Sequence, residues 1–234
     1  MKRQCGGIAV IWLAALLLVT CDGGGMGNNR LAEYFAGTPL REPVEAIQKR
    51  DTNRLRRWLD GGGEARAAGN HGMTLLHWAL LAEDLQGFQL LLARGADPNT
   101  RLEDGAALMP LAATHPDSSF LTLALRYGGD PNTTDGRGYT PLMRSITNRR
   151  DVNARLLLDA GAHVDAATPN GFTALTFAVG NDSKEQVVLL LRYGADPLAP
   201  GSDGINARKK ADMGADPALQ KLLDDELARR ARTR

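Results

Sequence analysis

The chain has 234 residues, of which 43% are hydrophobic, 24% charged and 5% aromatic. This length allows a core that folds without covalent cross-links, and a net charge of +1 gives no strong field for nucleic acid or an anionic surface. Both cysteines, Cys5 and Cys21, lie in the first 21 residues, which argues against a disulfide framework or a thiolate metal site in the folded part. With four histidines in addition, we expect no metal and no cofactor.

The first twenty residues have the pattern of a secretory signal peptide. Lys2 and Arg3 precede an apolar run over 8–19, and no acidic residue occurs before Asp22. The run is shorter than the roughly 20 apolar residues that cross a bilayer. We therefore expect residues 1–20 to be an export signal.

The end of this run, Leu18-Val19-Thr20-Cys21, resembles the bacterial lipobox. The resemblance implies that Cys21 is lipidated and becomes the new N-terminus, although Thr20 stands where glycine, alanine or serine is usual. The alternative is an uncleaved N-terminal anchor with an incidental cysteine. Asp22 resembles a retention signal of enteric lipoproteins and favours the inner membrane, and the glycine-rich segment 21–30 predicts a flexible tether.

A 33-residue period governs the remainder of the chain. Two series of glycines share this spacing: Gly72, Gly105, Gly138, Gly171 and Gly204, and Gly62, Gly95, Gly128, Gly161 and Gly194. The sequence around them aligns without gaps, as in GMTLLHWA at 72–79, GYTPLMRS at 138–145 and GFTALTFA at 171–178.

These segments resemble the ankyrin repeat, with its pattern G-x-T-P-L-H-x-A followed by L-L-x-x-G-A. The resemblance implies an all-α ankyrin-repeat solenoid over residues 31–230, each unit having two short antiparallel helices and a hairpin loop, the finger. We assign a degenerate repeat at 39–71, full repeats at 72–104, 105–137, 138–170 and 171–203, a C-terminal cap at 204–230 and a basic tail at 231–234.

Departures from the pattern predict local differences. Thr74, Thr140 and Thr173 precede first helices and can cap their free amides, whereas the repeat at 105–137 lacks this threonine. The sequence His115-Pro116-Asp117 predicts that the first helix of this repeat ends early.

Catalytic chemistry is not evident. His77 occupies the repeat's T-L-L-H position, and the resemblance implies a role in the hydrogen-bond network between adjacent loops. The serines show no G-x-S-x-G nucleophile elbow, and the glycines lack the spacing of a phosphate loop. We expect a protein that is not an enzyme.

Binding residues are expected at the positions that the repeat pattern leaves free. Six residues after each leading glycine, on the concave side, come Trp78, Leu111, Arg144 and Phe177, followed by Lys210 in the cap. Trp78 and Phe177 are either exposed anchors or packed over their helix neighbours. Finger tips supply a second set, which is mildly acidic and suits a basic partner, or is only a set of solvated loops: His71, Glu103, Asp104, Asp135, Arg137, Asn170 and Asp203.

Architecture, export and size resemble ankyrin immunity proteins that neutralise lipase or phospholipase toxins of the type VI secretion system. That resemblance implies a lipid-anchored monomer on the periplasmic side of a Gram-negative membrane, with a secreted toxin and not a nucleic acid as its partner. The alternative is a periplasmic ankyrin scaffold in oxidative-stress defence.

Overall fold

The computed structural model describes residues 33–199, 201, 204–214 and 216–232. The predicted signal peptide, Cys21, the tether and Asp203 lie outside this part. Among the helices of the described segments, none combines the length and hydropathy required to traverse a bilayer.

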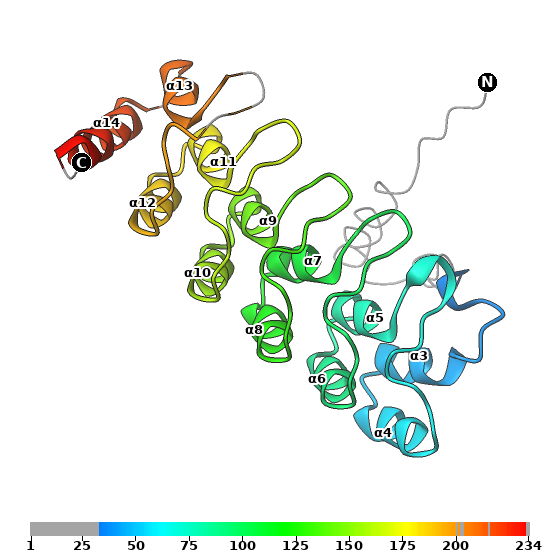
Figure 1. The fold of residues 1–234 in the computed structure, drawn as a ribbon. Helices are drawn as coiled ribbons and strands as arrows, with labels where there is room; N and C mark the ends of the chain where they lie inside the picture. Colours follow the sequence, from blue (N-terminus) through cyan, green and yellow to red (C-terminus); the bar gives the residue numbers. More distant parts are fainter. Residues whose placement is uncertain (1–32, 200, 202–203, 215, 233–234) are drawn as a thin grey trace, which may run out of the picture. The chain divides into compact units, whose positions relative to one another are not determined.

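The helices recur with the spacing of the glycines (Figure 1). Each of the four full repeats has a first helix of seven residues and a second helix of nine, and equivalent helices begin 33 residues apart. The first helices are α5 (Leu75–Leu81), α7 (Leu108–Thr114), α9 (Pro141–Thr147) and α11 (Ala174–Gly180). The second helices are α6 (Leu85–Ala93), α8 (Ser118–Arg126), α10 (Asp151–Asp159) and α12 (Lys184–Arg192).

Shorter and longer elements flank these repeats. Before them lie η1 (Glu33–Phe35), α3 (Arg41–Gln48), α4 (Thr52–Asp60) and η2 (Asn70–Gly72), and after them α13 (Ala207–Asp212) and α14 (Pro217–Arg232). At 16 residues α14 is longer than any second helix of the full repeats. In the described part there is no extended strand, only isolated bridges that close three fingers.

The helix ends follow local chemistry. The hydroxyls of Thr74, Thr140 and Thr173 accept the backbone amides of His77, Met143 and Thr176, as their N-cap positions predict. The second helices are followed by glycines in the left-handed region, with φ of 86–88° at Gly95, Gly128, Gly161 and Gly194.

The prediction that His115-Pro116-Asp117 shortens its helix is wrong. Helix α7 has the same seven residues as its counterparts, because it ends at Thr114, before the proline. In three other repeats the residue equivalent to Pro116 is left-handed, with φ of 54° at Glu83, Arg149 and Asp182, a conformation closed to proline. Helix α10 compensates for this different turn: Asn153 donates to the carbonyl oxygens of Ala113 (3.0 Å) and His115 (2.9 Å).

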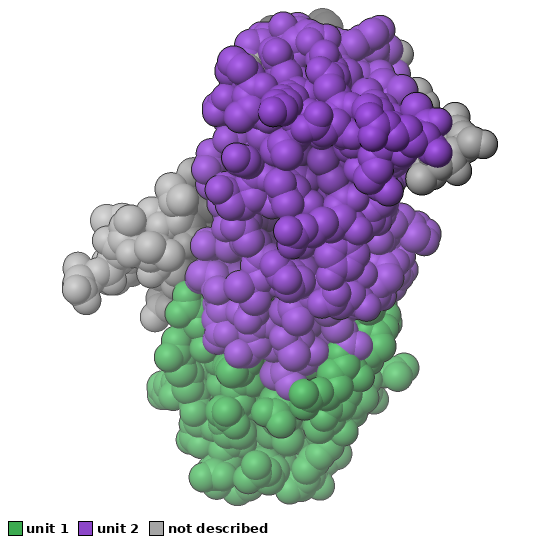
Figure 2. Space-filling view, turned by 90° about the vertical axis from the view of Figure 1, so that its left-hand side faces the viewer, with its two compact units in different colours: residues 1–108, 126–129 green, residues 109–125, 130–234 purple. Residues whose placement is uncertain are grey.

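The chain divides into two compact units (Figure 2), one formed by residues 1–108 and 126–129 and the other by 109–125 and 130–234. In the first, α5 packs on α3 and α6 on α4. In the second, α11 lies between α9 and α13, and α12 packs on α14. The repeat's small residue is fully buried in each case, which lets neighbouring helices approach: Ala79, Ala112, Ser145, Ala178 and Ala211.

Candidate protein-binding site

Three aromatic side chains form a partly exposed cluster, here called the aromatic strip, made by one residue of α11 and by the residues two positions ahead of α9 and of α11: Phe177, Tyr139 and Phe172. The ring centroids of Tyr139 and Phe177 are 5.3 Å apart and nearly parallel, and those of Phe172 and Phe177 are 5.7 Å apart. Tyr139 and Phe172 follow the leading glycines of two successive repeats, so the 33-residue period places them side by side. All three rings are half-buried, which leaves apolar surface available for contact.

An ion pair fixes one end of the strip. The Arg144 guanidinium carbon lies 4.3 Å from the centre of the Tyr139 ring, within cation–π range, while Nε donates to Asp135 Oδ2 at 2.7 Å. A second guanidinium nitrogen also donates to this oxygen. Only 15% of the Arg144 side chain and 10% of the Asp135 side chain is exposed, so the pair is held in a single arrangement.

Asp135 also shapes the finger from which it comes. Its Oδ1 accepts the backbone amides of Arg137 (2.9 Å) and Tyr139 (3.0 Å). The carboxylate therefore uses one oxygen to fold the loop and the other to orient Arg144. This arrangement lowers the entropy that Arg144 and Tyr139 lose when a partner binds.

The strip continues along the repeat position six residues after each leading glycine, where binding residues are expected. Leu111 on α7 and Lys210 on α13 are half-buried at equivalent positions to Arg144 and Phe177. Lys210 crosses the end of α11, since a β-carbon placed on Gly180 would lie 3.7 Å from its Cε. Aromatic rings, an oriented arginine and an aliphatic side chain make up the chemistry of protein-binding surfaces.

Trp78 does not belong to this surface. Of the two expected environments, an exposed anchor or a side chain packed over its helix neighbours, the structure shows the packed one. The side chain is 2% exposed, its Nε1 donates to the carbonyl oxygen of Val44 at 3.3 Å, and the Phe35 ring meets it edge-on at 5.5 Å. Phe35 comes from η1, ahead of the first predicted repeat. The chain's own N-terminal segment thus covers the concave position that a partner would need.

The finger residues divide into exposed and structural ones. His71 and Glu103 pair at 3.0 Å between Nδ1 and Oε2 and are both well exposed, as are Arg137 and Asn170. Asp104 instead accepts the backbone amide of Ala106 at 2.9 Å and stabilises its turn. Three aspartates that follow the second helices have the same role, since each accepts the backbone amide two residues further on: Asp97, Asp130 and Asp196.

His77 is fully buried, and burial lowers the pKa of its imidazole to about 4. Its Nδ1 lies 2.8 Å from the Thr74 hydroxyl, and its Nε2 has no hydrogen-bond partner among the described residues. The expected network between adjacent loops is therefore replaced by a bond inside its own repeat. In the same described part, no group of three or more acidic, histidine or cysteine side chains is arranged to hold a metal ion.

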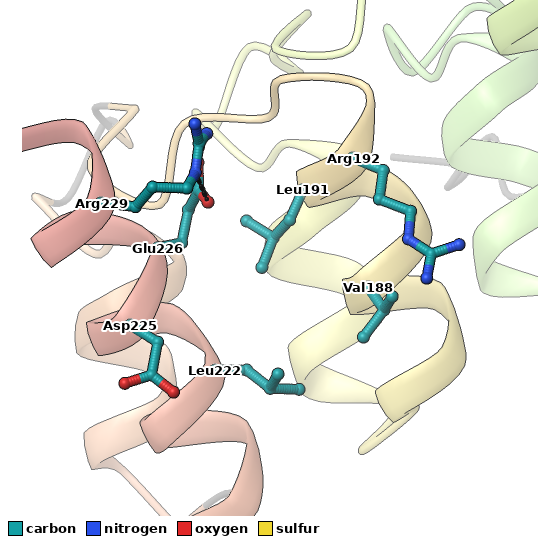
Figure 3. A pocket seen from close by; sticks show the side chains of 7 residues that line it. All are labelled: Val188, Leu191, Arg192, Leu222, Asp225, Glu226 and Arg229. Atoms are coloured by element: carbon teal, nitrogen blue, oxygen red, sulfur yellow. Dashed lines mark hydrogen bonds and ion pairs between the residues drawn. The ribbon is translucent and has the colours of Figure 1, made fainter. Parts of the chain in front are cut away.

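A hollow of about 510 Å³ lies between α12 and α14, away from the aromatic strip (Figure 3). Leu191 is half-buried there, whereas its neighbour Leu190 is fully buried, so this pair of leucines only partly fills the core between stacked helices. Its lining combines aliphatic and charged side chains: Val188, Leu191, Arg192, Leu222, Asp225, Glu226 and Arg229. Glu226 forms ion pairs with Arg229 and Arg230, which lower the pKa of its carboxyl to about 2.

Comparisons with known proteins agree with this architecture. A family model for three copies of the ankyrin repeat matches residues 109–200, and one for a single ankyrin repeat matches residues 71–101, together more than half of the chain. The chain therefore belongs to the ankyrin-repeat proteins. No curated protein sequence matches it significantly.

Solved structures of ankyrin proteins are similar to most of the chain. An ankyrin repeat domain from Acinetobacter baumannii has 26% identity and a TM-score of 0.74, covering 79% of this chain and 96% of that one. The ankyrin repeat domain of Bcl-3, a member of the IkappaB family, has 26% identity and a TM-score of 0.71, with 83% and 86% covered. The ankyrin repeat protein EF0377 has 25% identity and a TM-score of 0.69, with 80% and 96% covered.

Sequence reasoning missed Tyr139 and Phe172. The signal was present, since each is the aromatic residue directly after a leading glycine, 33 residues from the other. It was overlooked because the equivalent residues, Met73 and Ala106, are not aromatic. The contact of Tyr139 with Phe177 comes only from packing α9 against α11, whereas Phe172 meets Phe177 within its own repeat.

Proposed function

We propose that this chain is a non-catalytic protein-binding module whose contact site is the aromatic strip with Arg144. The observation that carries the proposal is the half-buried stack of three rings next to an arginine already oriented by Asp135. Such groups contribute most of the binding free energy at protein interfaces when a partner excludes water from them. Ankyrin repeats in general mediate binding between proteins, which supports the same conclusion.

We further propose the biological setting: an exported, lipid-anchored monomer on the periplasmic side of a Gram-negative membrane, acting as an immunity protein. It would cover the active-site mouth of a lipase or phospholipase toxin of the type VI secretion system. The basic and apolar leader, the cysteine at its end and the ankyrin architecture support this setting. The membrane anchor would hold the inhibitor beside the lipid that the toxin attacks.

Competition between strains tests this setting. A deletion strain should be killed by toxin-bearing siblings, and a copy of the gene should restore survival. A copy carrying Phe177→Ala should restore it less well than the matched control Val152→Ala, which truncates an exposed side chain on α10. Normal survival of the deletion strain would contradict the immunity role, and sensitivity to peroxide in its place would favour the stress-defence scaffold.

A further inference from the structure

Two cationic side chains border the aromatic strip, although the fingers taken together are mildly acidic. Two cations border the rings: Arg144, stacked on Tyr139, and Lys210, which crosses α11 at Gly180. Gly180 lies three residues after Phe177, so both are on one side of the helix. The Lys210 side chain therefore reaches the end of α11 on the side of the helix that carries Phe177.

Only one of these two cations is neutralised. Arg144 is paired with Asp135, whereas Lys210 and the adjacent Lys209 form no ion pair in the part of the chain that the structure describes. The third basic residue of α13, Arg208, differs because it pairs with Asp212 and with Asp224. At its α13 end the strip consequently combines apolar rings with positive charge that no described residue neutralises.

We infer that the strip binds an acidic peptide segment of the partner, with a large apolar side chain seated on Phe177 and a carboxylate paired with Lys210. This inference rests on the proposed binding function and deepens it by stating the chemistry of the partner. It reverses the expectation from the finger sequences, which favoured a basic partner. A peptide that covers the rings would also exclude water from Lys210, which makes the charge pair stronger than on an open surface.

Selection from a phage-displayed library of random peptides tests the inference, because such a library presupposes no particular partner. Peptides are selected on the full chain and then compared on Phe177→Ala, Lys210→Glu and Lys210→Gln. Lys221→Glu, which makes the same charge change at an exposed position on α14, is the matched control. Far-ultraviolet circular dichroism confirms that each variant is folded.

We expect the selected peptides to combine an aromatic or large aliphatic residue with Asp or Glu. Affinity should fall at least tenfold with Lys210→Glu, less with Lys210→Gln and not with Lys221→Glu, and added salt should weaken binding to the parent chain. Peptides that depend on Phe177 but lack acidic residues, or that bind Lys210→Glu as well as the parent, would overturn the inference alone. Failure to select any peptide that depends on Phe177 would overturn the proposed function as well.

Discussion

At the scale of single residues, the two large aromatic side chains that sequence analysis treated alike have different environments. Trp78 and Phe177 occupy equivalent positions of their repeats. Trp78 is 2% exposed under Phe35, whereas Phe177 is half-buried against two other rings. The difference arises because the first unit has an N-terminal segment packed on Trp78, while a short polar helix, α13, follows Phe177.

This contrast predicts different costs of truncation. Trp78→Ala should lower the free energy of unfolding by about 3–5 kcal/mol, because it leaves a cavity and removes the hydrogen bond to Val44. Phe177→Ala should lower it by less than about 2 kcal/mol, because the ring is already partly in water. Urea denaturation of both variants measures the two costs, and equal values would contradict the assigned environments.

His77 predicts a dependence of stability on pH. Its pKa is about 4 in the folded protein and 6.5 when exposed, so between these values the unfolded chain binds a proton that the folded chain does not. The contribution of neutral His77 to the free energy of unfolding is therefore complete above pH 6.5. It is lost as the pH falls towards 4, by about 3 kcal/mol in total.

The free energy of unfolding, measured in urea at several pH values between 7 and 4.5, checks this expectation. His77→Gln should show a shallower decrease than the parent chain, whatever its absolute stability. His163→Gln, at an exposed histidine, should retain the parent's decrease. If the slope is unchanged in His77→Gln, the buried imidazole is not the group responsible.

At the scale of elements, a ladder of side chains caps the second helices from the preceding repeat. Arg66 donates to the Gly95 carbonyl oxygen, and Asn99 and Asn132 to those of Gly128 and Gly161, each 29 residues ahead. The next member of the series, Asp165, cannot donate, because a carboxylate only accepts hydrogen bonds. Arg230 of α14 replaces it, donating to the carbonyl oxygens of Gly194 (3.0 Å) and Ala195 (2.6 Å).

Because α14 extends beyond nine residues, it can present Arg230 to these carbonyl oxygens. The replacement predicts that a second substitution can restore stability lost at Arg230. Arg230→Ala should destabilise the end of the second unit by about 1–3 kcal/mol, because two carbonyl oxygens lose a charged donor. Adding Asp165→Asn should recover part of the loss. The new amide would donate to Gly194 while its oxygen still accepts the Asp196 amide, as Asn132 does for His163.

Hydrogen exchange of the α12 and α14 amides, together with urea denaturation, measures both variants. Asp165→Asn alone should change little, since Arg230 already occupies the carbonyl. If the amides of the double variant exchange as fast as those of Arg230→Ala alone, an asparagine at position 165 cannot replace Arg230 as a donor.

At the scale of the whole molecule, we propose separate roles for the apolar leader, which would anchor the protein, and for the repeats, which would bind its partner. The leader ends at Cys21, beyond which the chain contains no cysteine, so lipidation at that thiol is the chemical step that would fix the repeats to a membrane. Several acyl chains are required for firm attachment, because one is marginal. The location proposed for the protein depends on this modification.

Cys21→Ser should therefore move the protein from the detergent phase to the aqueous phase in detergent partitioning. Mass spectrometry of the N-terminal peptide should show acyl groups on Cys21 of the parent chain and loss of residues 1–20. Equal partitioning of the two forms, or an intact leader in the parent chain, would favour the alternative, an uncleaved N-terminal anchor with an incidental cysteine.

Most of the fold follows from the sequence, and much less of the site. The caps at Thr74, Thr140 and Thr173, the left-handed glycines and the buried small residues are local consequences of a repeated pattern, so alignment at 33 residues predicts them. The same alignment predicts Arg144 and Phe177 as binding residues. It does not predict their relation to Asp135, Tyr139 and Phe172, because these three residues are not shared by the other repeats, and the contact of Tyr139 with Phe177 joins two repeats.

The sequence alone determined the ankyrin class, the helix pairs and the period, since each unit's backbone hydrogen bonds and turns are local. The tertiary structure decided which variable positions are available to a partner: Phe35 covers Trp78, Asp135 holds Arg144, and Lys210 lies near Gly180 without an ion pair to any described residue. Burial and ion pairing depend on what packs against a residue from elsewhere in the chain. A repeated sequence therefore specifies the scaffold, and the side chains that bind are selected by what the repeats and their caps leave uncovered.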